Sequence, residues 1–390
     1  MPELVPQDLE KLLGQKVQYK DRLGRTLLMP DESYYAVCDQ KNQTTQHVSE
    51  SICKQFLKFL LVAMTVTISI MGLLYILPFF PGGVEEKEAF EIFIAKYQKV
   101  YETSDLYNEA FQIFLDNWAN LKTEREKQPE VEFDVHEWMD VPEGEMRMKF
   151  AVIHGDLPDI SEGTSMKKFD GFEGKVNRPA SHSWRDKATR VKNQGSCGSC
   201  WAFSTVASVE LAHVIAGKPM TELSEQELVD CEGSSKGCHG GVRAYALAFV
   251  MKTGLVKEQE YPYMGTDGHQ CVNNQTSARI KISDYRMLSK DESVMADWVY
   301  NKGPVTFGMK VISSMYSYRS GVFHPSDEDC STKSEGNHAM LIVGYGTENG
   351  KDYWLVKNSW GPSWGDSGYF KLARGVNACG MAESAAAPIY

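Results

Sequence analysis

The chain has 390 residues, with 41 Lys and Arg against 52 Asp and Glu, and a formal net charge of −11 at pH 7. Its 42% hydrophobic and 24% charged residues are ordinary for a globular protein, which excludes collagen-like, coiled-coil and wholly disordered chains. The acidic excess argues against general nucleic-acid binding, because phosphate contacts rely on Lys and Arg. Function must therefore be sought in local sites.

An uncharged segment early in the chain predicts a membrane anchor at residues 56–80. The run from Phe59 to Phe80 has 22 residues and no charge, enough to cross a hydrocarbon core of about 30 Å. A cleaved signal peptide would begin near residue 1, whereas 58 residues precede this run. The alternative is a buried core helix, but such helices seldom extend this far without a charge.

The charges that flank this segment predict its orientation. Lys54 and Lys58 precede it, whereas three glutamates and one lysine follow at 85–88. The positive-inside rule then makes residues 1–55 a cytoplasmic tail and places the rest of the chain in a lumen or outside the cell, as in a single-pass type II membrane protein. In this topology the sequon at Asn274 is glycosylated and the sequon at Asn42 is not.

The nine cysteines are unevenly distributed. Cys38 and Cys53 lie in the predicted cytoplasmic tail, where thiols stay reduced, and the other seven lie from residue 197 onward. Seven is odd, so oxidation of that half leaves one thiol for another role. Spacing alone does not determine the disulfides, because six cysteines allow fifteen pairings.

Hydrophobic periodicity predicts a helix-rich region followed by a strand-rich one. Two amphipathic helices are expected between about 86 and 127, and an extended connector is expected after Trp138. From about residue 178 a helix should begin at Cys200 and stop at Gly217. Strands are expected at 305–307, 339–343, 352–356 and 369–372. This order predicts an α+β fold.

Residues 194–201, Gln-Gly-Ser-Cys-Gly-Ser-Cys-Trp, carry the first chemical signal. At a helix start, Cys200 meets unpaired backbone N–H groups and the positive helix end, which favour the nucleophilic thiolate. His338 stands at the head of an apolar strand, where a rigid element can direct it toward the thiol. Asn358 can accept the imidazole N–H, and Trp360 can shield that bond from water. These residues form a nucleophile, a base and an orienting group.

The segment Cys197-Gly-Ser-Cys200 has a rival interpretation as a redox dithiol or as half of a zinc site. A zinc site of this kind normally uses a second Cys-x-x-Cys. The sequence contains no second copy, which disfavours the rival.

These motifs resemble the papain-like cysteine proteases of the cathepsin L type, whose signature includes Cys-Gly-Ser-Cys-Trp. His338 and Asn358 follow Cys200 by 138 and 158 residues, close to the family spacing. The Gly-Cys-His-Gly-Gly stretch at 237–241 extends the match, which covers 178–390. The resemblance implies a two-lobed papain-like fold, with a helical left lobe and a β-barrel-like right lobe, behind a helical inhibitory prodomain and one transmembrane helix.

The resemblance also implies roles. Cys200 would be the nucleophile, His338 its acid/base partner and Asn358 the orienting group. Gln194 would donate its amide to the oxyanion together with the backbone N–H of Cys200, and losing such a donor typically costs about a hundred- to a thousand-fold in rate. The alternative for Gln194 is a loop amide satisfied by backbone. The implied disulfides are Cys197–Cys238, Cys231–Cys271 and Cys330–Cys379, with Cys200 free.

Substrate-binding residues follow from the same resemblance. Gly240 and Gly241 would pair with the substrate backbone, since glycine permits close approach. The pocket for the second residue before the scissile bond, the P2 residue, would be bounded by Val242, Arg243, Gly308, Gly336 and Ser384, and Trp360 also lines the site. Apolar residues usually fill the position of Arg243, so this departure leaves the usual preference for a bulky apolar P2 residue open. Glu383 is expected either to pair with Arg243 or to face solvent.

Residues 81–177 resemble the family's inhibitory propeptide, with altered motifs. Ile113, Phe114 and Asn117 fit its helical motif, but Leu106, Ala110 and Arg125 replace the usual Glu, Arg and Asn. In the following Gly-x-Asn-x-Phe-x-Asp motif, Trp138 and Asp140 remain, and Asp134 and His136 replace Gly and Asn. We expect this segment to dock on the catalytic domain and return through the cleft. Protonation of Asp140 and Glu143 is then expected to weaken docking at low pH.

The anchored arrangement resembles the falcipain and cryptopain types of apicomplexan parasites. It predicts a membrane-anchored zymogen of an endopeptidase, processed near residue 178 and active in an acidic endosome, lysosome or vacuole-like compartment. Its expected partners are protein and peptide substrates, its own propeptide, cystatin-like inhibitors and the membrane, but no nucleic acid. No metal or organic cofactor is implied. The alternatives are a catalytically silent binding protein on the same fold and an exopeptidase, which would need an occluding insertion that the sequence does not show.

Overall fold

The computed structural model describes residues 19–20, 26–27, 84–149, 167–272 and 278–390. The chain divides into two units, residues 1–79 and 80–390. In the first unit the described residues are strands β1 (Tyr19–Lys20) and β2 (Thr26–Leu27), which pair antiparallel. Among the described helices, none is long and apolar enough to cross a membrane. The predicted anchor at 56–80 lies outside the described residues, as do Cys38, Cys53, Asn42 and Asn274.

The second unit begins with the two helices predicted for the prosegment, α3 (Val84–Tyr97) and α4 (Ser104–Lys127). The side chain of Thr103 caps α4 by accepting a hydrogen bond from the backbone N–H of Leu106. The buried rings of Phe90 and Phe114 pack with their centroids 5.1 Å apart. The apolar spacing in the sequence thus corresponds to the contact between these helices.

A third prosegment helix corrects the extended connector predicted after Trp138. Helix α5 (Glu143–Lys149) begins directly after Pro142, whose carbonyl accepts hydrogen bonds from the N–H groups of Glu145 and Met146. Proline is favourable just before a helix, where no backbone N–H is needed. Met146 is buried in the core, so tertiary packing stabilises a helix too short to show a clear period.

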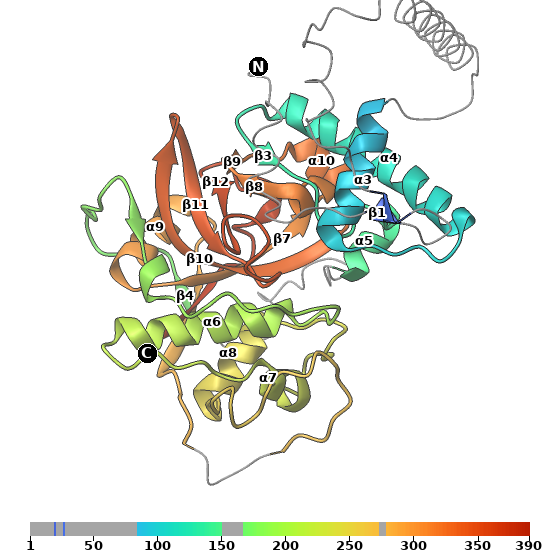
Figure 1. Cartoon of the computed structure of the whole chain (residues 1–390). Helices are drawn as coiled ribbons and strands as arrows, with labels where there is room; N and C mark the ends of the chain where they lie inside the picture. Colours follow the sequence, from blue (N-terminus) through green and yellow to red (C-terminus); the bar gives the residue numbers. More distant parts are fainter. Residues whose placement is uncertain (1–18, 21–25, 28–83, 150–166, 273–277) are drawn as a thin grey trace, which may run out of the picture. The chain divides into compact units, whose positions relative to one another are not determined.

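Among the described residues, a nine-stranded sheet forms the second half of the unit (Figure 1). The hydrogen-bonded order is β4-β6-β13-β7-β10-β11-β12-β9, with β5 paired to β10. The β4–β6 and β12–β9 pairs are parallel and the others antiparallel. Each strand predicted from the sequence lies within one of these. The bounds are β4 (Lys168–Phe169), β5 (His182–Ser183), β6 (Asp284–Leu288), β7 (Val305–Val311), β9 (Val322–Phe323), β10 (Gly336–Glu348), β11 (Lys351–Lys357), β12 (Tyr369–Ala373) and β13 (Ala386–Ile389).

Helices α6 (Cys200–Ile215), α7 (Glu225–Cys231) and α8 (Arg243–Lys252) form a separate layer below the sheet in Figure 1. Helix α6 is apolar around most of its circumference and is buried between α8 and β10. Its first residue is Cys200, so the central helix places that side chain where the two layers meet. The remaining helices are α9 (Glu292–Asn301) and α10 (Asp327–Thr332).

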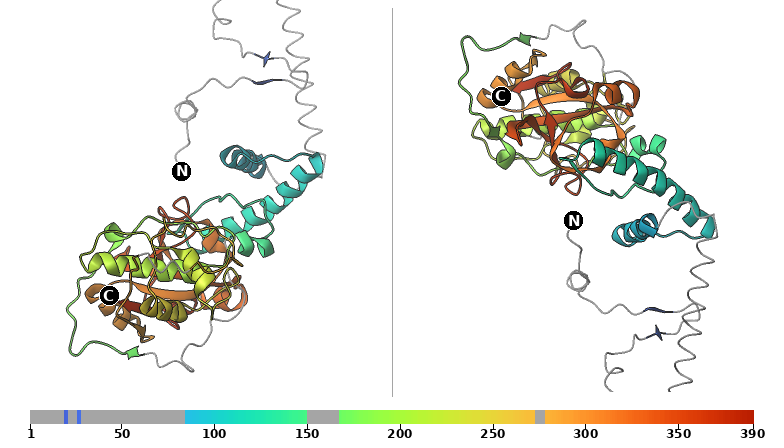
Figure 2. Two further views of the ribbon diagram at one scale, coloured as in Figure 1. Left: turned by 90° about the horizontal axis from the view of Figure 1, so that it is seen from below. Right: turned by 90° about the horizontal axis from the view of Figure 1, so that it is seen from above.

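The prosegment attaches to the sheet side of the unit. Strand β3 (Glu132–Phe133) pairs antiparallel with β8 (Tyr318–Ser320), and Asp134 donates its backbone N–H to the carbonyl of Ser317 at 2.8 Å. Figure 2 shows α3, α4 and α5 grouped on this side of the sheet in both views.

Candidate active site

Cys200 is a buried free thiol in the first turn of α6. The other cysteines from residue 197 onward form the disulfides Cys197–Cys238, Cys231–Cys271 and Cys330–Cys379. Because Cys197 is bonded to Cys238, the rival interpretation of Cys197 and Cys200 as a dithiol or zinc pair is wrong. The Cys197–Cys238 bridge also ties the loop before α6 to the loop before α8.

His338 lies on β10, next to the strand whose end carries Asn358. The imidazole Nε2 and the Asn358 Oδ1 are 2.7 Å apart, and both side chains are buried. The Trp360 ring stacks on the imidazole with centroids 4.6 Å apart and planes 21° apart. A buried hydrogen bond covered by an aromatic ring is protected from competing water, so the ring orientation is fixed.

The backbone next to His338 contacts the Cys200 thiol. The N–H of Ala339, the residue after His338, lies against the Cys200 sulfur and favours its anionic form. The His338 Nδ1 atom, on the ring edge opposite Asn358, has no hydrogen-bond partner among the described residues. One ring nitrogen is therefore held by Asn358, which leaves the other to exchange a proton with a neighbouring group.

Burial dominates the electrostatics of this pair. It raises the pKa of the Cys200 thiol to about 11, against the opposing effects of the Ala339 N–H and the Arg243 charge. It also lowers the pKa of His338 to about 4, against the hydrogen bond with Asn358. In this structure, in which the prosegment is still attached, both pKa shifts favour a neutral thiol and a neutral imidazole. A thiolate and an imidazolium would therefore need further stabilisation, which two opposite charges can supply to each other by attraction.

Gln194 is fixed beside Cys197 and Ser359. Its Nε2 donates to the Cys197 carbonyl at 3.0 Å, and its Oε1 accepts from the Ser359 hydroxyl at 2.5 Å. The Tyr263 hydroxyl donates to the Gln194 carbonyl at 2.8 Å, which holds the backbone of the same loop. An amide nitrogen carries two N–H bonds, so the bond to Cys197 does not exhaust its donor capacity.

A buried ionic cluster beneath this loop was not predicted from the sequence. Lys192 Nζ lies 2.8 Å from each carboxylate oxygen of Glu225 and 3.3 Å from Glu210 Oε1. Burial opposes its charge, but these carboxylates outweigh burial and raise the pKa of Lys192. Lys357, the residue before Asn358, joins the cluster by donating to Thr189 at 3.0 Å. The members are scattered along the sequence with no local pattern, so only the fold reveals that they support both the Gln194 loop and the Asn358 strand.

The predicted substrate-binding residues occupy adjoining elements. Gly308 on β7 is paired with Ala339 on β10, and Gly336 is paired with Val311. Gly240 has a φ of 108°, and an added Cβ at Gly241 would lie 2.3 Å from the Trp201 ring. Glycine is therefore favoured at Gly240 by its positive φ and at Gly241 by the close approach of the Trp201 ring.

Arg243 resolves one of the open alternatives. Its Nη2 donates to the Ser384 carbonyl at 2.8 Å and to the Ser384 hydroxyl at 2.6 Å. Glu383 instead pairs with Lys290 and accepts from Asn377 at 2.9 Å. Of the two alternatives for Glu383, pairing with Arg243 is therefore wrong, and Glu383 lies at the surface with Lys290 and Asn377 as partners.

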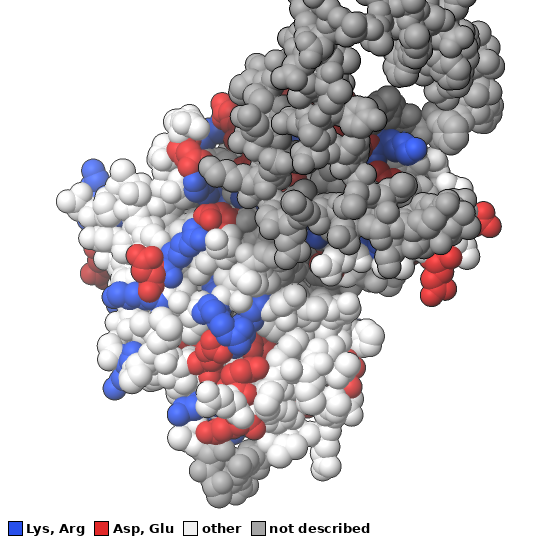
Figure 3. Space-filling view, in the orientation of Figure 1, with Lys and Arg blue, Asp and Glu red and all other residues white. Residues whose placement is uncertain are grey.

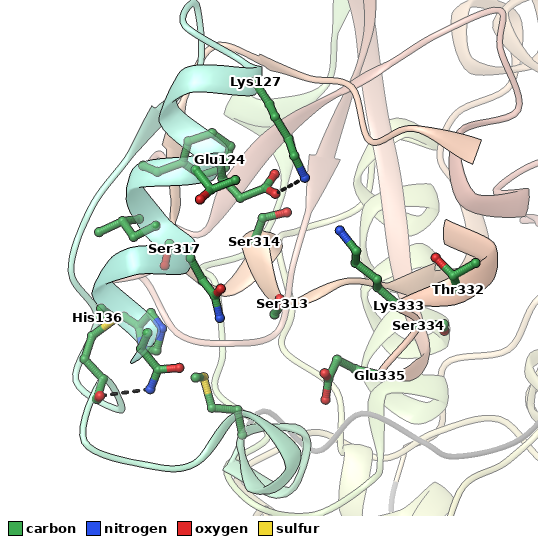
Figure 4. A pocket seen from close by; sticks show the side chains of 17 residues that line it. Glu124, Lys127, His136, Ser313, Ser314, Ser317, Thr332, Lys333, Ser334 and Glu335 are labelled. Atoms are coloured by element: carbon green, nitrogen blue, oxygen red, sulfur yellow. Dashed lines mark hydrogen bonds and ion pairs between the residues drawn. The ribbon is translucent and has the colours of Figure 1, made fainter. Parts of the chain in front are cut away.

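The interface between the prosegment and the catalytic domain combines apolar packing, in which the buried rings of Phe133 and Phe323 have centroids 6.2 Å apart, with polar contacts. The polar contacts include Asp134 Oδ2 to Arg319 Nε at 3.5 Å, Glu132 with the Ser320 hydroxyl at 2.9 Å, and Gln128 Oε1 with the backbone N–H of His324 at 2.9 Å. A cavity of about 470 Å³ remains between the two parts. Figure 4 shows His136 and the α4 residues Glu124 and Lys127 along one side of it.

The two carboxylates predicted to sense acid are placed differently from that expectation. Asp140 accepts from Lys99 Nζ and from the Tyr101 hydroxyl, both at 2.9 Å, and both partners belong to the prosegment itself. It therefore stabilises the fold of the prosegment rather than a contact across the interface. The side chain of Glu143 lies outside the described residues.

Surface charge on the face drawn in Figure 3 is mixed. Acidic and basic side chains are interspersed over the described part of this face, without a continuous field of one sign. Long-range attraction of a charged partner to this face is therefore weak, and recognition of charge must come from local groups.

Comparison with known proteins agrees with the geometry. Residues 178–389 match the model of the papain family cysteine proteases. The chain is 36% identical over 311 residues to Pro-cathepsin H of Mus musculus, covering 78% of this chain and 91% of the relative. It is 34% identical to Cysteine proteinase 1 of Dictyostelium discoideum, covering 84% and 97%. The structure of digestive procathepsin L2 from Tenebrio molitor larval midgut matches with a TM-score of 0.69 and 34% identity, covering 78% of this chain and all of that chain.

These matches show that the chain belongs to the papain family. It is a cysteine peptidase, and its similarity to procathepsins shows that it has the form of a zymogen activated by removal of a propeptide.

Proposed function

We propose that the chain is an endopeptidase in which Cys200, His338, Asn358 and Gln194 perform the reaction. The observation that carries these roles is the orientation of His338, whose Nε2 is held by Asn358 at 2.7 Å while the adjoining Ala339 N–H faces the Cys200 sulfur. One imidazole edge is fixed by Asn358, and Nδ1 on the other edge has no hydrogen-bond partner among the described residues.

The reaction follows from this arrangement. The Cys200 thiolate attacks the scissile carbonyl, and the oxyanion receives hydrogen bonds from the Gln194 amide and the Cys200 backbone N–H. Imidazolium at His338 gives its proton to the leaving amine, which leaves an acyl-enzyme. Neutral His338 then takes a proton from water, which attacks the acyl carbon and releases the thiolate.

The test is cleavage of peptides that are blocked at the N-terminus. The full-length chain is brought from neutral to acidic pH until the prosegment is removed, and hydrolysis of N-blocked dipeptidyl fluorogenic substrates is followed. Hydrolysis of blocked substrates supports an endopeptidase, and cleavage only of substrates with a free N-terminus would instead support an exopeptidase. Silence with the prosegment gone would favour the non-catalytic binding protein.

We propose further that the prosegment inhibits the catalytic domain and is released by acid through His136. This side chain is buried next to the β3–β8 contact, in the environment of Arg319 of the catalytic domain. Its pKa is lowered from 6.5 to about 3, chiefly by burial; the charges of Arg319 and Lys99 act in the same direction, and Asp134 opposes them. Docking is thus undisturbed above pH 6.5 and weakens as the pH falls from 6.5 toward 3.

Asp134 does not respond in the same pH range. Burial opposes its charge, but hydrogen bonds from Lys96 and the Val135 N–H and the charges of Lys96 and Arg319 hold its pKa below the ordinary 3.8. A carboxylate with a lowered pKa contributes its stabilisation above its ordinary value and loses it only below. The Asp134 contacts therefore persist at pH 5, where His136 already opposes docking.

The topology belongs to the same proposal. We infer a type II membrane protein with domains 1–55, 56–80, 81–177 and 178–390, whose catalytic domain acts in an acidic lumenal compartment. The uncharged run from Phe59 to Phe80 and the flanking lysines support it. A glycan on Asn274 with none on Asn42, read by mass spectrometry, is the expected result. A glycan on Asn42 would overturn the orientation.

A further inference from the structure

A buried arginine beside the catalytic centre has half of its guanidinium unpaired. Arg243 is only 6% exposed, and no carboxylate lies within ion-pair distance of it in the described part of the chain. It is also the first residue of α8, where the positive helix end disfavours a cation. A buried charge without a partner is costly, and neither packing nor capping explains why the chain places one here.

The guanidinium is held from one side only. Nη2 donates to the carbonyl and the hydroxyl of Ser384, whereas Nη1 has no hydrogen-bond partner among the described residues. The nearest acidic residue in sequence to Ser384 is Glu383, and that carboxylate is occupied by Lys290 and Asn377. Arg243 is thus fixed in position with a charged donor left over.

The sheet register places this donor beside the catalytic residues. Strand β13 pairs with β7 at Ala386 and Thr306, and Ser384 lies in the turn directly before β13. Gly308 on β7 is paired with Ala339, the neighbour of His338. The anchor of Arg243 therefore lies just before a strand that pairs with β7, and β7 in turn pairs with the strand that carries the base.

Electrostatic coupling to the nucleophile agrees with this position. Burial lowers the pKa of Arg243 to about 10, and the charge of Cys200 acts in the opposite direction. Arg243 therefore stays cationic at the neutral and acidic pH values at which the peptidase would work.

We propose that Arg243 determines specificity at the P2 position and selects aspartate or glutamate there. The inference rests on the proposed endopeptidase function and adds its substrate class. A P2 carboxylate accepts the hydrogen bond from Nη1 and supplies the missing counterion, and such charge-assisted bonds are among the strongest in proteins. An apolar P2 side chain would instead exclude water from the cation without giving it a hydrogen-bond partner. Bulky apolar residues at P2 are therefore disfavoured.

The test compares N-blocked fluorogenic dipeptides that differ only at P2, which is Glu, Asp, Gln, Leu or Phe. The acid-processed full-length protein should cleave the Glu peptide with a kcat/KM about tenfold or more above that of the Gln peptide, an uncharged isostere. This panel uses the unaltered protein and is decisive without any variant.

The variant Arg243→Met should reverse the order, because it replaces the cation by an apolar chain of similar length. The readout is the ratio of kcat/KM for the Glu peptide to that for the Leu peptide. If Arg243 acted only through its charge near Cys200, the variant would change the rates of all peptides equally and this ratio would stay the same. Arg243→Lys should keep part of the preference. Lys252→Met, at the exposed end of the same helix, removes the same charge and should leave the ratio unchanged.

The outcomes separate the two proposals. Cleavage with equal rates, or with a preference for Leu or Phe in the unaltered protein, overturns the acidic preference while leaving the endopeptidase. An unchanged Glu-to-Leu ratio in Arg243→Met overturns the assignment to Arg243. Absence of cleavage of every peptide after the prosegment is gone overturns the endopeptidase and this inference together.

Discussion

The catalytic centre and the prosegment interface each bury a histidine, and the two rings differ in their surroundings. Burial lowers the pKa of His338 to about 4 and that of His136 to about 3. His338 is held by Asn358 and stacked on Trp360, and the backbone of its neighbour Ala339 contacts the Cys200 thiol, so in the proposed reaction its proton has a chemical use. His136 faces the charges of Arg319, Lys99 and Asp134, and a proton there changes only the strength of docking.

The difference shows that the same perturbation yields two functions. In the proposed reaction, the imidazole exchanges a proton with the Cys200 thiol, so the protonation state of His338 depends on that of Cys200. At the interface, protonation of His136 destabilises the contact between the prosegment and the catalytic domain, so acid favours release of the prosegment. Substitutions in the two regions should therefore separate catalysis from docking.

The largest effect is expected from Cys200→Ala. Removal of the sulfur should lower hydrolysis on the order of 10⁶-fold, because no other group can form the acyl-enzyme. Fluorogenic hydrolysis is measured after a trace of active enzyme has removed the prosegment in trans, and an unchanged thermal transition shows that the fold is kept. Activity within tenfold of the unaltered protein would remove Cys200 from the nucleophile role.

Gln194→Ala should have the next largest effect. One oxyanion donor is lost, which should lower kcat by about a hundred- to a thousand-fold with a small change in KM. The Ser359 hydroxyl also loses its acceptor, so Ser359→Ala is the matched control for that contact. Equal losses in the two variants would mean that Gln194 acts by supporting the loop alone.

Changes at His136 should alter docking without altering catalysis. In a Cys200→Ala background, hydrogen exchange of α4 is followed from pH 7.5 to 4.5 and corrected for the intrinsic exchange rate. The equilibrium constant for undocking should increase by about tenfold for each pH unit below 6.5. The reason is that His136 binds a proton in this range when undocked, whereas its lowered pKa keeps it neutral when docked. His136→Gln should lose this dependence.

The control for this experiment is His324→Gln. His324 lies at the same interface and contacts Gln128 through its backbone, but its side chain is exposed. Its substitution should leave the slope against pH unchanged. If His136→Gln and the unaltered protein opened with the same slope, the acid response would reside in other groups.

Much of this site could be predicted because its signals are local. Cys200 stands in a dense motif at the start of a strongly apolar helix, and His338 and Asn358 follow strand patterns at the family spacing. Helices α3 and α4 were predicted from periodicity, and both form over the expected region. By contrast, α5 was missed because Pro142 and Gly144 suggest a loop, and only burial of Met146 favours the helix.

The remaining features depend on contacts between distant parts of the sequence. Arg243 was identified as a departure, but its partner Ser384 is 141 residues away, and the adjacent Glu383 was the more obvious candidate. The position of Asp140 within the prosegment likewise follows from Lys99 and Tyr101, which no motif links to it. Periodicity reports which face is buried, but it does not report which charges meet there.

The smallest effect, expected from Asn117→Ala, separates fold from pH response within the prosegment. The buried Asn117 amide donates to the carbonyls of Met139 and Val141, both at 2.9 Å, and holds the turn that follows His136. Two unsatisfied carbonyls within the prosegment should destabilise its fold, and with it the docked state, by about 1–3 kcal/mol. Because this cost is independent of protonation, exchange of α4 should rise equally at every pH, while the slope due to His136 persists. Asn120→Ala, an exposed substitution on the same helix, should change neither quantity, and a slope altered by Asn117→Ala would mean that turn geometry sets the pKa of His136.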